Sequence, residues 1–376
     1  MRPSASSMPR GRRCPRKSQK LPKQGGTRMP DTILTPGRRL VLAGAAGALS
    51  LPFIRPARAA EQMVIGTWGG DYANLLRANV EEPLLVPKGI TVVQDLGDED
   101  PRIAKLYAQR RLPRGAVDVA CAQANRGYEV SAAGLAEPID EKKVPNLAHV
   151  LPHLRNDAYA PHIYSPQVLI YNPEKVSSPP TSFKDLLDPK YKGRVGLGNG
   201  NYFYVMMAAA QAATGDLNKV DTDAARDMMG KLNANGLRLY PSTDSIGAGI
   251  KSGEIDVGII WLARVIMWQN AGIPVKASFP REGNILYVSG MLIPRNAPNK
   301  ETAYKYLNAM LEPSAQAEFA AKMGYLPTVD NCPLTGKVGE QLALPADVKM
   351  LPPDYSVLGK LQSATSEWWK KNIAGA

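Results

Sequence analysis

The stretch Ser252-Gly-Glu-Ile-Asp-Val-Gly-Ile-Ile-Trp-Leu-Ala-Arg264 decides the fold. Its first three residues are typical of a turn, and residues 255–260 form an apolar, β-branched run that predicts a buried strand of an α/β sheet. Ligands of open α/β sheets bind beyond the carboxyl ends of the strands. Trp261 and Arg264 follow this strand, so they could hold a small molecule by stacking and by a bidentate carboxylate contact. A core tryptophan with a solvated arginine remains the other interpretation.

Outward from this stretch, strand-like and helix-like patterns alternate. We expect strands near residues 63–68, 90–95, 117–121, 162–172, 193–198, 237–240 and 284–294. Helices are expected over 71–82, 102–111, 125–133, 182–187, 202–215, 221–233, 242–251, 300–311, 314–322 and 357–371, with 334–344 irregular. This alternation predicts an α/β fold with a parallel sheet and right-handed crossovers. Pro166 interrupts one long strand, and a proline suits a crossing between domains better than a central ladder position.

The basic residues are concentrated at the start of the chain. The formal charge is +12 over 376 residues, but residues 1–59 hold 13 Lys and Arg and one acidic residue. The remainder holds 33 basic and 33 acidic residues and is neutral. A neutral body has no net field with which to collect phosphates, so nucleic acid is not an expected partner.

Residues 1–59 are interpreted as an export leader. Gly37-Arg-Arg-Leu40 begins a charged region with the paired arginines of a twin-arginine signal, and an apolar stretch runs to Phe53. Ala57-Arg-Ala59 supplies a small-x-small cleavage pattern. We therefore expect a mature, periplasmic protein from about Ala60. An oxidising compartment would permit a disulfide between Cys121 and Cys332, although Cys121 is also typical of a small buried residue.

Signatures of enzymes and metal sites are sparse. His149 and His153 have the spacing of two ligands on one helical face, but Pro152 argues against that helix and no third ligand is evident. No metal, cofactor or catalytic residue is expected, and the chain is interpreted as a non-enzyme. The loop Gly196-Leu-Gly-Asn-Gly200 lacks the third glycine of a dinucleotide fingerprint. This loop is either a helix N-terminus that can bind an anion or a turn without a binding role. Similarly, Gly69, Asp71 and Tyr72 either line a cleft or only begin the next helix.

Several stretches together resemble one family, the periplasmic substrate-binding proteins of ABC importers, and within it the spermidine/putrescine-binding group. The stretches are Ile65–Tyr72, Asp118–Gln123, Gly134–Asp140, Pro180–Gly193, Gly253–Trp261 and Glu282–Pro294. This resemblance implies the type II periplasmic binding fold, in which two α/β lobes are joined by crossing strands and hold the ligand between them. We expect residues 60–166 plus 287–326 in lobe one and 171–283 plus 330–376 in lobe two.

The resemblance also implies ligand-binding positions. They match the rings of Trp68 and Trp261, the cleft residues near Gln123 and near Asn201 and Tyr202, and the positions of Arg264 and Ser289. Polyamine-binding members of the family carry carboxylates at those last two positions. This chain has a guanidinium and a hydroxyl there, and a fixed cation would repel a polyamine and attract a carboxylate.

The sequence therefore predicts a monomeric receptor for a small carboxylate-bearing or zwitterionic solute, which it delivers to a membrane permease. Arg264 would bind the anionic end, and Asp71 or Asp244 could take an amino group. A polyamine receptor with rearranged acids is the alternative. A periplasmic enzyme on the same fold is a more remote one. The adjacent tyrosine pair of iron-binding relatives is absent.

Overall fold

The computed structural model describes residues 61–375. The expected leader, including its paired arginines and its cleavage pattern, lies outside the described residues. None of the helices between residues 61 and 375 combines the length and apolar character that a membrane span requires.

One mixed sheet organises the fold, in the order β2-β1-β3-β9-β4-β7-β5-β6. These strands are β1 Glu61–Thr67, β2 Ile90–Leu96, β3 Val119–Gln123, β4 Ala160–Tyr171, β5 Val195–Gly198, β6 Arg238–Tyr240, β7 Val257–Trp261 and β9 Asn284–Leu292. Short strands β8 Lys276–Ser278 and β10 Leu326–Pro327 pair with β4, and β11 Met350–Leu351 pairs with β9.

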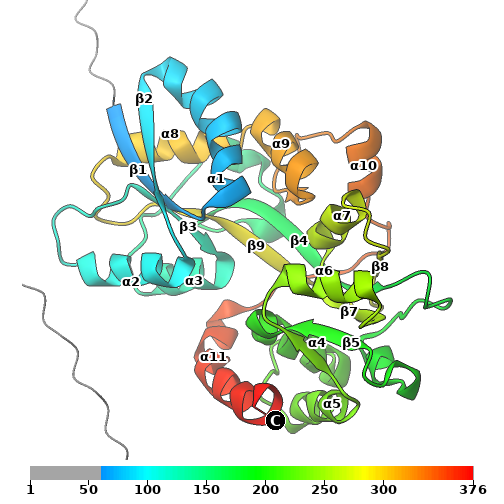
Figure 1. Ribbon diagram of the computed structural model, residues 1–376. Coiled ribbons are helices and arrows are strands. Elements are labelled where there is room, and N and C mark those ends of the chain that lie inside the picture. Colours follow the sequence, from blue (N-terminus) through cyan, green and yellow to red (C-terminus); the bar gives the residue numbers. More distant parts are fainter. Residues whose placement is uncertain (1–60, 376) are drawn as a thin grey trace, which may run out of the picture. The chain divides into compact units, whose positions relative to one another are not determined.

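The prediction of a purely parallel sheet is wrong at its centre. The outer sets β2-β1-β3 and β7-β5-β6 are parallel, as expected. Strands β4 and β9 run antiparallel to each other and to their other neighbours in the sheet, β7 and β3. Both strands connect the two parallel sets, as Figure 1 shows. Strand β4 leads the chain from the first set to the second and β9 leads it back, so the two strands run in opposite directions.

Strand β4 changes partners at a proline. Its first part, through Pro166, pairs with β9, and its last part, from Gln167, pairs with β7. The register shifts between Pro161 and Ile163. A proline has no N–H to donate, so it fits where a strand leaves one ladder for another. The interpretation of Pro166 as a crossing point agrees with this geometry.

Helices pack on both sets of strands. Those of the first part of the chain are α1 Gly70–Leu76, continued by the π-helix η1 Arg77–Leu85, then α2 Glu99–Gln109 and α3 Ala124–Ala132. The middle of the chain holds α4 Tyr202–Thr214, α5 Asp223–Ala234, α6 Thr243–Ser252 and α7 Leu262–Asn270. The last are α8 Lys300–Met310, α9 Pro313–Met323, α10 Gly336–Leu342 and α11 Tyr355–Trp369, followed by η8 Lys370–Ala374.

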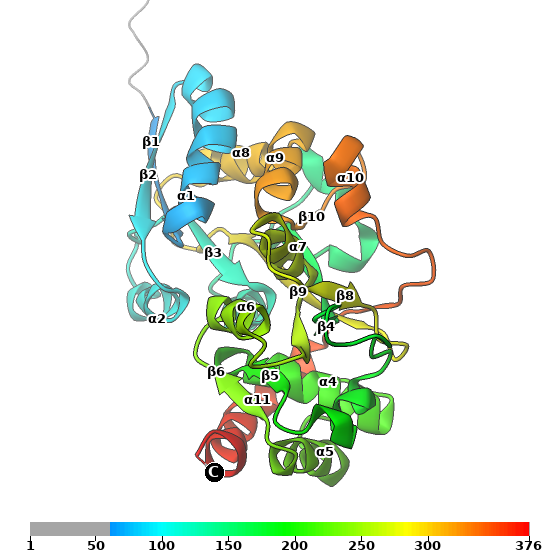
Figure 2. The same cartoon turned by 45° about the vertical axis from the view of Figure 1, so that its right-hand side comes forward.

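Short 3₁₀ turns connect these elements: η2 Val86–Lys88, η3 Pro145–His149, η4 Pro152–Leu154, η5 Phe183–Leu187, η6 Pro189–Tyr191 and η7 Asn199–Asn201. Two helices differ from the sequence analysis. Helix α7 was not expected, and α10 forms where an irregular segment was predicted. In Figure 2, α11 lies beside α4 and α5, and it also packs against α3.

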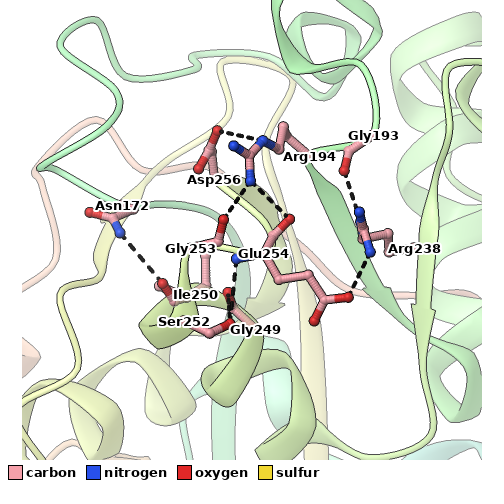
Figure 3. A network of polar contacts seen from close by, with 10 residues as sticks. All are labelled: Asn172, Gly193, Arg194, Arg238, Gly249, Ile250, Ser252, Gly253, Glu254 and Asp256. Carbon is pink, nitrogen blue, oxygen red and sulfur yellow. Dashed lines mark hydrogen bonds and ion pairs between the residues drawn. The ribbon is translucent and has the colours of Figure 1, made fainter.

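The turn that precedes β7 is fixed by arginines from neighbouring strands (Figure 3). Arg194 donates from its Nη1 to the carbonyls of Gly253 and Glu254. Arg238 donates to the carbonyl of Gly193 at 2.8 Å and pairs with the Glu254 carboxylate at 2.7 Å. Gly253 closes α6 with a φ of 71°, a conformation that glycine adopts without steric cost. The start of β7 is thereby tied to β5 and β6.

Glycine lets β7 approach β5 closely. A Cβ at Gly258 would lie 2.4 Å from the carbonyl oxygen of Gly196. We expect Gly258→Ala to lower the free energy of unfolding by about 1–3 kcal/mol, because the added methyl group overpacks a buried strand pair. Urea denaturation measures this effect. Gly230→Ala, in an exposed turn of α5 with no atom near its Cβ position, should be neutral or stabilising. Equal effects of the two substitutions would contradict the close approach.

Candidate functional site

Two cavities lie beside strand β9 and the start of α7. The larger, about 370 Å³, is lined by Trp68, Gly69, Asp71, Tyr72, Ile163, Arg264, Met267, Tyr287, Ser289, Met323 and Tyr325. The smaller, about 170 Å³, is lined by Gln123, Gly200, Asn201, Tyr204, Thr243, Trp261, Arg264, Tyr287 and Tyr325. They share Arg264, Tyr287 and Tyr325, so we treat them together and call them the cleft.

Trp68 is held at the mouth of the cleft by its neighbours. It follows the end of β1, and its ring is half-buried. The Tyr72 ring meets it edge-on with centroids 5.2 Å apart, and the Arg102 guanidinium lies 5.0 Å from its centroid. Arg102 is itself buried and donates to the carbonyls of Cys121 and Gly97 at 2.7 and 2.6 Å. The indole is therefore positioned before any ligand arrives.

A buried histidine fixes Tyr72. The Tyr72 hydroxyl oxygen lies 2.8 Å from Nδ1 of His162, and both side chains pack against Phe319. Burial raises the pKa of Tyr72 well above its ordinary value and lowers the pKa of His162 to about 3. The His162 Nε2 atom has no hydrogen-bond partner among the described residues. Both groups are thus uncharged at neutral pH, and the polar end of Tyr72 is occupied.

Arg264 places a positive charge in the cleft without a counter-ion. It stands in the first turn of α7, directly after β7 ends at Trp261. A cation there opposes the helix macrodipole, so helix stability does not explain its position. No carboxylate of residues 61–375 lies within ion-pair distance of Arg264, and its buried Nε has no acceptor there. Its Nη1 lies 3.6 Å from the sulfur of Met267. A buried donor without a partner is costly, and a ligand anion would supply the missing acceptor.

Aromatic rings surround this guanidinium. Tyr287 lies between Trp261 and Tyr325, with centroids 5.0 and 6.1 Å away, and Tyr204 meets Trp261 edge-on at 4.7 Å. Trp261 is only 5% exposed, whereas Tyr287 is half-buried. Burial raises the pKa of Tyr287 and of Tyr325, and the charge of Arg264 opposes both shifts. The more accessible ring on this side of the cleft is therefore Tyr287.

Ser289 and Gln123 face each other across the β3–β9 ladder. The Ser289 hydroxyl donates to the carbonyl of Ala122 at 3.3 Å and is fully buried. The Gln123 backbone N–H donates to the Glu99 carboxylate at 2.5 Å. The side-chain amide of Gln123 makes no hydrogen bond within residues 61–375. Of this pair, Gln123 keeps free hydrogen-bonding groups for a ligand.

Residues 88–346 match the family of bacterial extracellular solute-binding proteins. This chain belongs to that family. It is 26% identical over 263 residues to the spermidine/putrescine-binding periplasmic protein of Escherichia coli K12, which covers 64% of this chain and 73% of the relative. It is also 26% identical over 320 residues to the putrescine-binding periplasmic protein PotF of the same organism, covering 76% and 82%.

The fold is that of the type II periplasmic solute-binding proteins. An ABC transporter substrate-binding protein from Bradyrhizobium japonicum superposes with a TM-score of 0.71 at 22% identity, covering 83% of this chain and 99% of that one. The two α/β sets of strands joined by β4 and β9 are the lobes and crossing strands of this fold. The prediction of fold class and family is confirmed.

The structure of this solute-binding protein brings most of the expected site residues together. Those that line the cleft are Trp68, Gly69, Asp71, Tyr72, Gln123, Asn201, Trp261, Arg264 and Ser289. Tyr202 and Asp244 are not among the lining residues. The Tyr202 ring packs toward Phe203 and Trp369, and Asp244 is exposed in the first turn of α6, where its neighbour Thr243 lines the cleft instead.

Sequence reasoning missed several lining residues of the solute-binding protein. Tyr287 could have been found, because it precedes Ser289 by two residues and strand side chains alternate between faces. Tyr325, Met267 and Met323 gave no signal, since α7, α9 and the residues after α9 reach the cleft only through tertiary packing. The loop Gly196–Gly200 forms the end of β5 and η7, and its Gly200 lines the smaller cavity.

The other candidate chemistry is not assembled. No group of three or more metal-ligating side chains occurs in residues 61–375. His149 instead pairs with Asp330 at 3.0 Å. Cys121 and Cys332 are both buried free thiols, so the permitted disulfide is not formed.

The buried His162 makes stability depend on pH. In the unfolded chain a histidine takes up a proton below about pH 6.5, whereas His162 in the folded protein resists it down to a pKa of about 3. Lowering the pH therefore favours unfolding. We expect the free energy of unfolding to fall by about 2 kcal/mol between pH 7 and 5 from this group, at about 1.4 kcal/mol per pH unit.

Urea denaturation at both pH values tests this. In His162→Gln the contribution should vanish, so the gap in stability between wild type and variant should narrow by about 2 kcal/mol at the lower pH. The control His149→Gln removes an exposed histidine. Its free energy of unfolding should still fall between pH 7 and 5 by the amount due to His162. A constant gap between wild type and His162→Gln would show that His162 is not the group responsible.

Proposed function

We propose that this protein is a periplasmic receptor of an ABC importer that binds a small carboxylate-bearing or zwitterionic organic solute and delivers it to a permease. The observation that carries the proposal is Arg264, a guanidinium in the cleft that has no carboxylate partner among the described residues. A bidentate carboxylate matches its donor geometry. No bond is made or broken in this function, and the receptor acts as a monomer.

The cleft offers complementary contacts for the rest of such a solute. The half-buried rings of Trp68 and Tyr287 would stack on its body, while Trp261 supports Tyr287 from behind. Asp71 is exposed, lines the same cavity as Arg264 and has no partner among the described residues. It would take an amino group. Asp244 lies off the lining and has no role in this proposal.

Binding would close the two lobes, defined as residues 60–166 plus 287–326 and 171–283 plus 330–376. The cleft is lined by Trp68, which follows β1, and by Arg264 of α7. The proposal assigns them to different lobes, which β4 and β9 join. A ligand that contacts both lobes favours the closed state, the hinge motion of periplasmic binding proteins. Closure also removes water and strengthens the contact to Arg264.

A polyamine receptor is the second candidate. It is favoured by the ligands named for the curated relatives and by the free carboxylate of Asp71 in an aromatic cleft. Arg264 opposes it, because a fixed cation repels an ammonium group. Mass spectrometry of the solute that co-purifies with the protein, with calorimetric titration of amino acids, dicarboxylates, putrescine and spermidine, separates the two. Turnover of any of these compounds would point instead to an enzyme on this fold.

Removing the guanidinium tests the proposal directly. Truncating one partner of a buried charge-assisted pair costs roughly 2–5 kcal/mol. We expect Arg264→Ala to weaken binding of the co-purified solute by about 30-fold or more, at tenfold per 1.4 kcal/mol. Arg264→Asp should weaken an anion further and admit a diamine.

Isothermal titration calorimetry of the variants gives the dissociation constants. The matched control is Arg281→Ala, which removes an exposed arginine away from the cleft and should leave binding unchanged. An unaltered dissociation constant in a folded Arg264→Ala protein would remove the carboxylate contact and restore the polyamine candidate.

The proposal includes export through the leader of residues 1–59, with cleavage near Ala59. A twin-arginine signal depends on both guanidinium groups, so replacing Arg38 and Arg39 together by Lys should block export and leave precursor in the cytoplasm. Immunoblots of periplasmic and cytoplasmic fractions measure this. Arg12→Lys with Arg13→Lys, a second arginine pair of the leader, serves as the control. Normal periplasmic yield from the first double variant would exclude the twin-arginine route.

A further inference from the structure

Two methionines lie in the wall of the cleft, and one touches its central charge. Met267 of α7 and Met323 of α9 both line the larger cavity and are half-buried. Met267 stands one helical turn after Arg264, and its sulfur is 3.6 Å from the Nη1 of that residue. Within residues 61–375, Met323 makes no hydrogen bond to Arg264. The pair therefore offers one sulfur that is hydrogen-bonded to the guanidinium and a second, in the same cavity, that is not.

The sulfur of Met267 is a poor partner for a guanidinium. A thioether is only a weak acceptor, and Arg264 keeps an unpartnered buried Nε as well. A methionine sulfoxide is different, because oxidation turns a flexible apolar side chain into a polar one. Its new oxygen is a strong acceptor, held one bond from a sulfur that is already within 3.6 Å of the Nη1 donor.

We propose that Met267 is an oxidation site whose sulfoxide occupies Arg264 and switches ligand binding off. The switch rests on the proposed function, in which Arg264 receives the anionic end of the solute. The oxidant is hydrogen peroxide. A lone pair of the Met267 sulfur attacks one peroxide oxygen, the S–O bond forms as the O–O bond breaks, and the departing oxygen leaves as water after proton transfer. The sulfur is oxidised by two electrons and the peroxide is reduced by two.

Position makes Met267 selective. Met63, Met206 and Met291 are fully buried in the core, where hydroperoxide has no access. The cleft is open to solvent and admits hydroperoxide, so Met267 and Met323 should react before these core methionines. A bound solute would fill the cleft and protect both. Of the two, Met267 alone is hydrogen-bonded to the guanidinium, so oxidation of Met323 should leave Arg264 free.

The first test needs no ligand. The purified protein is treated with hydrogen peroxide, and peptide mass spectrometry follows oxidation of each methionine. Phenylglyoxal, which adds covalently to free guanidinium groups, then reports the accessibility of Arg264. Oxidation of Met267 should precede that of the core methionines and slow the reaction of Arg264 severalfold. Oxidation of Met267 no faster than Met291, or an unchanged phenylglyoxal rate at Arg264, would overturn the proposal.

The second test measures binding of acetate, the simplest carboxylate, through the fluorescence of the tryptophans at the cleft. A hydrogen bond to a charged group implies a loss of about tenfold in acetate affinity after peroxide treatment. For each variant, the affinity for acetate after peroxide treatment is divided by the affinity before it. Met323→Leu should lose affinity on treatment as wild type does, so its ratio should match that of wild type. Met267→Leu should lose none, so its ratio should be close to one. Equal ratios in the two variants would overturn the switch.

An Arg264→Ala control separates this inference from the function on which it rests. If Arg264→Ala binds acetate as wild type does, the carboxylate receptor fails. The phenylglyoxal rates then still decide whether the sulfoxide covers Arg264. If Arg264→Ala loses acetate while peroxide treatment of wild type has no effect on acetate affinity, the receptor stands and the switch fails.

Discussion

The antiparallel pairing of β4 with β9 is the constraint on which the rest of the structure depends. These strands are the shared centre of two parallel sets, so each set must build outward from them. Pro166 ends the pairing of β4 with β9, and Gln167 begins its pairing with β7 opposite Trp261. The point at which β4 leaves β9 and begins to pair with β7 therefore also fixes the position of Trp261 and of the start of α7.

The cleft follows from that arrangement. Alternate residues of β9 face its two sides, so Tyr287 and Ser289 point into the cleft while Leu286 and Val288 face away. Helix α7 begins immediately after β7, which brings Arg264 into the same cavities as Tyr287. Because the aromatic rings exclude water from one side, the charge of Arg264 acts in a medium of lower dielectric constant and interacts more strongly with a ligand anion.

In the proposed function, the charge of the ligand is selected by local groups. Outside residues 1–59 the chain is neutral, so it has no field to draw in ligands of one sign. The resemblance to polyamine binders predicts carboxylates at the positions of Arg264 and Ser289, and this chain has a guanidinium and a hydroxyl there. In the proposed function, this difference of two side chains would reverse the preferred ligand charge.

The sequence by itself determined the eight longer strands and most helices, the crossing at Pro166 and the family, because apolar periodicity, glycine and proline act over a few residues. It also marked Trp68, which directly follows β1, and Arg264, which lies in the first helical turn after β7. Only the tertiary structure decided that β4 and β9 run antiparallel, that Tyr287 and not Trp261 is the accessible ring, that Tyr202 and Asp244 lie off the cleft, and that Met267 contacts Arg264. These depend on contacts between segments far apart in the chain, and local patterns carry no information about such contacts.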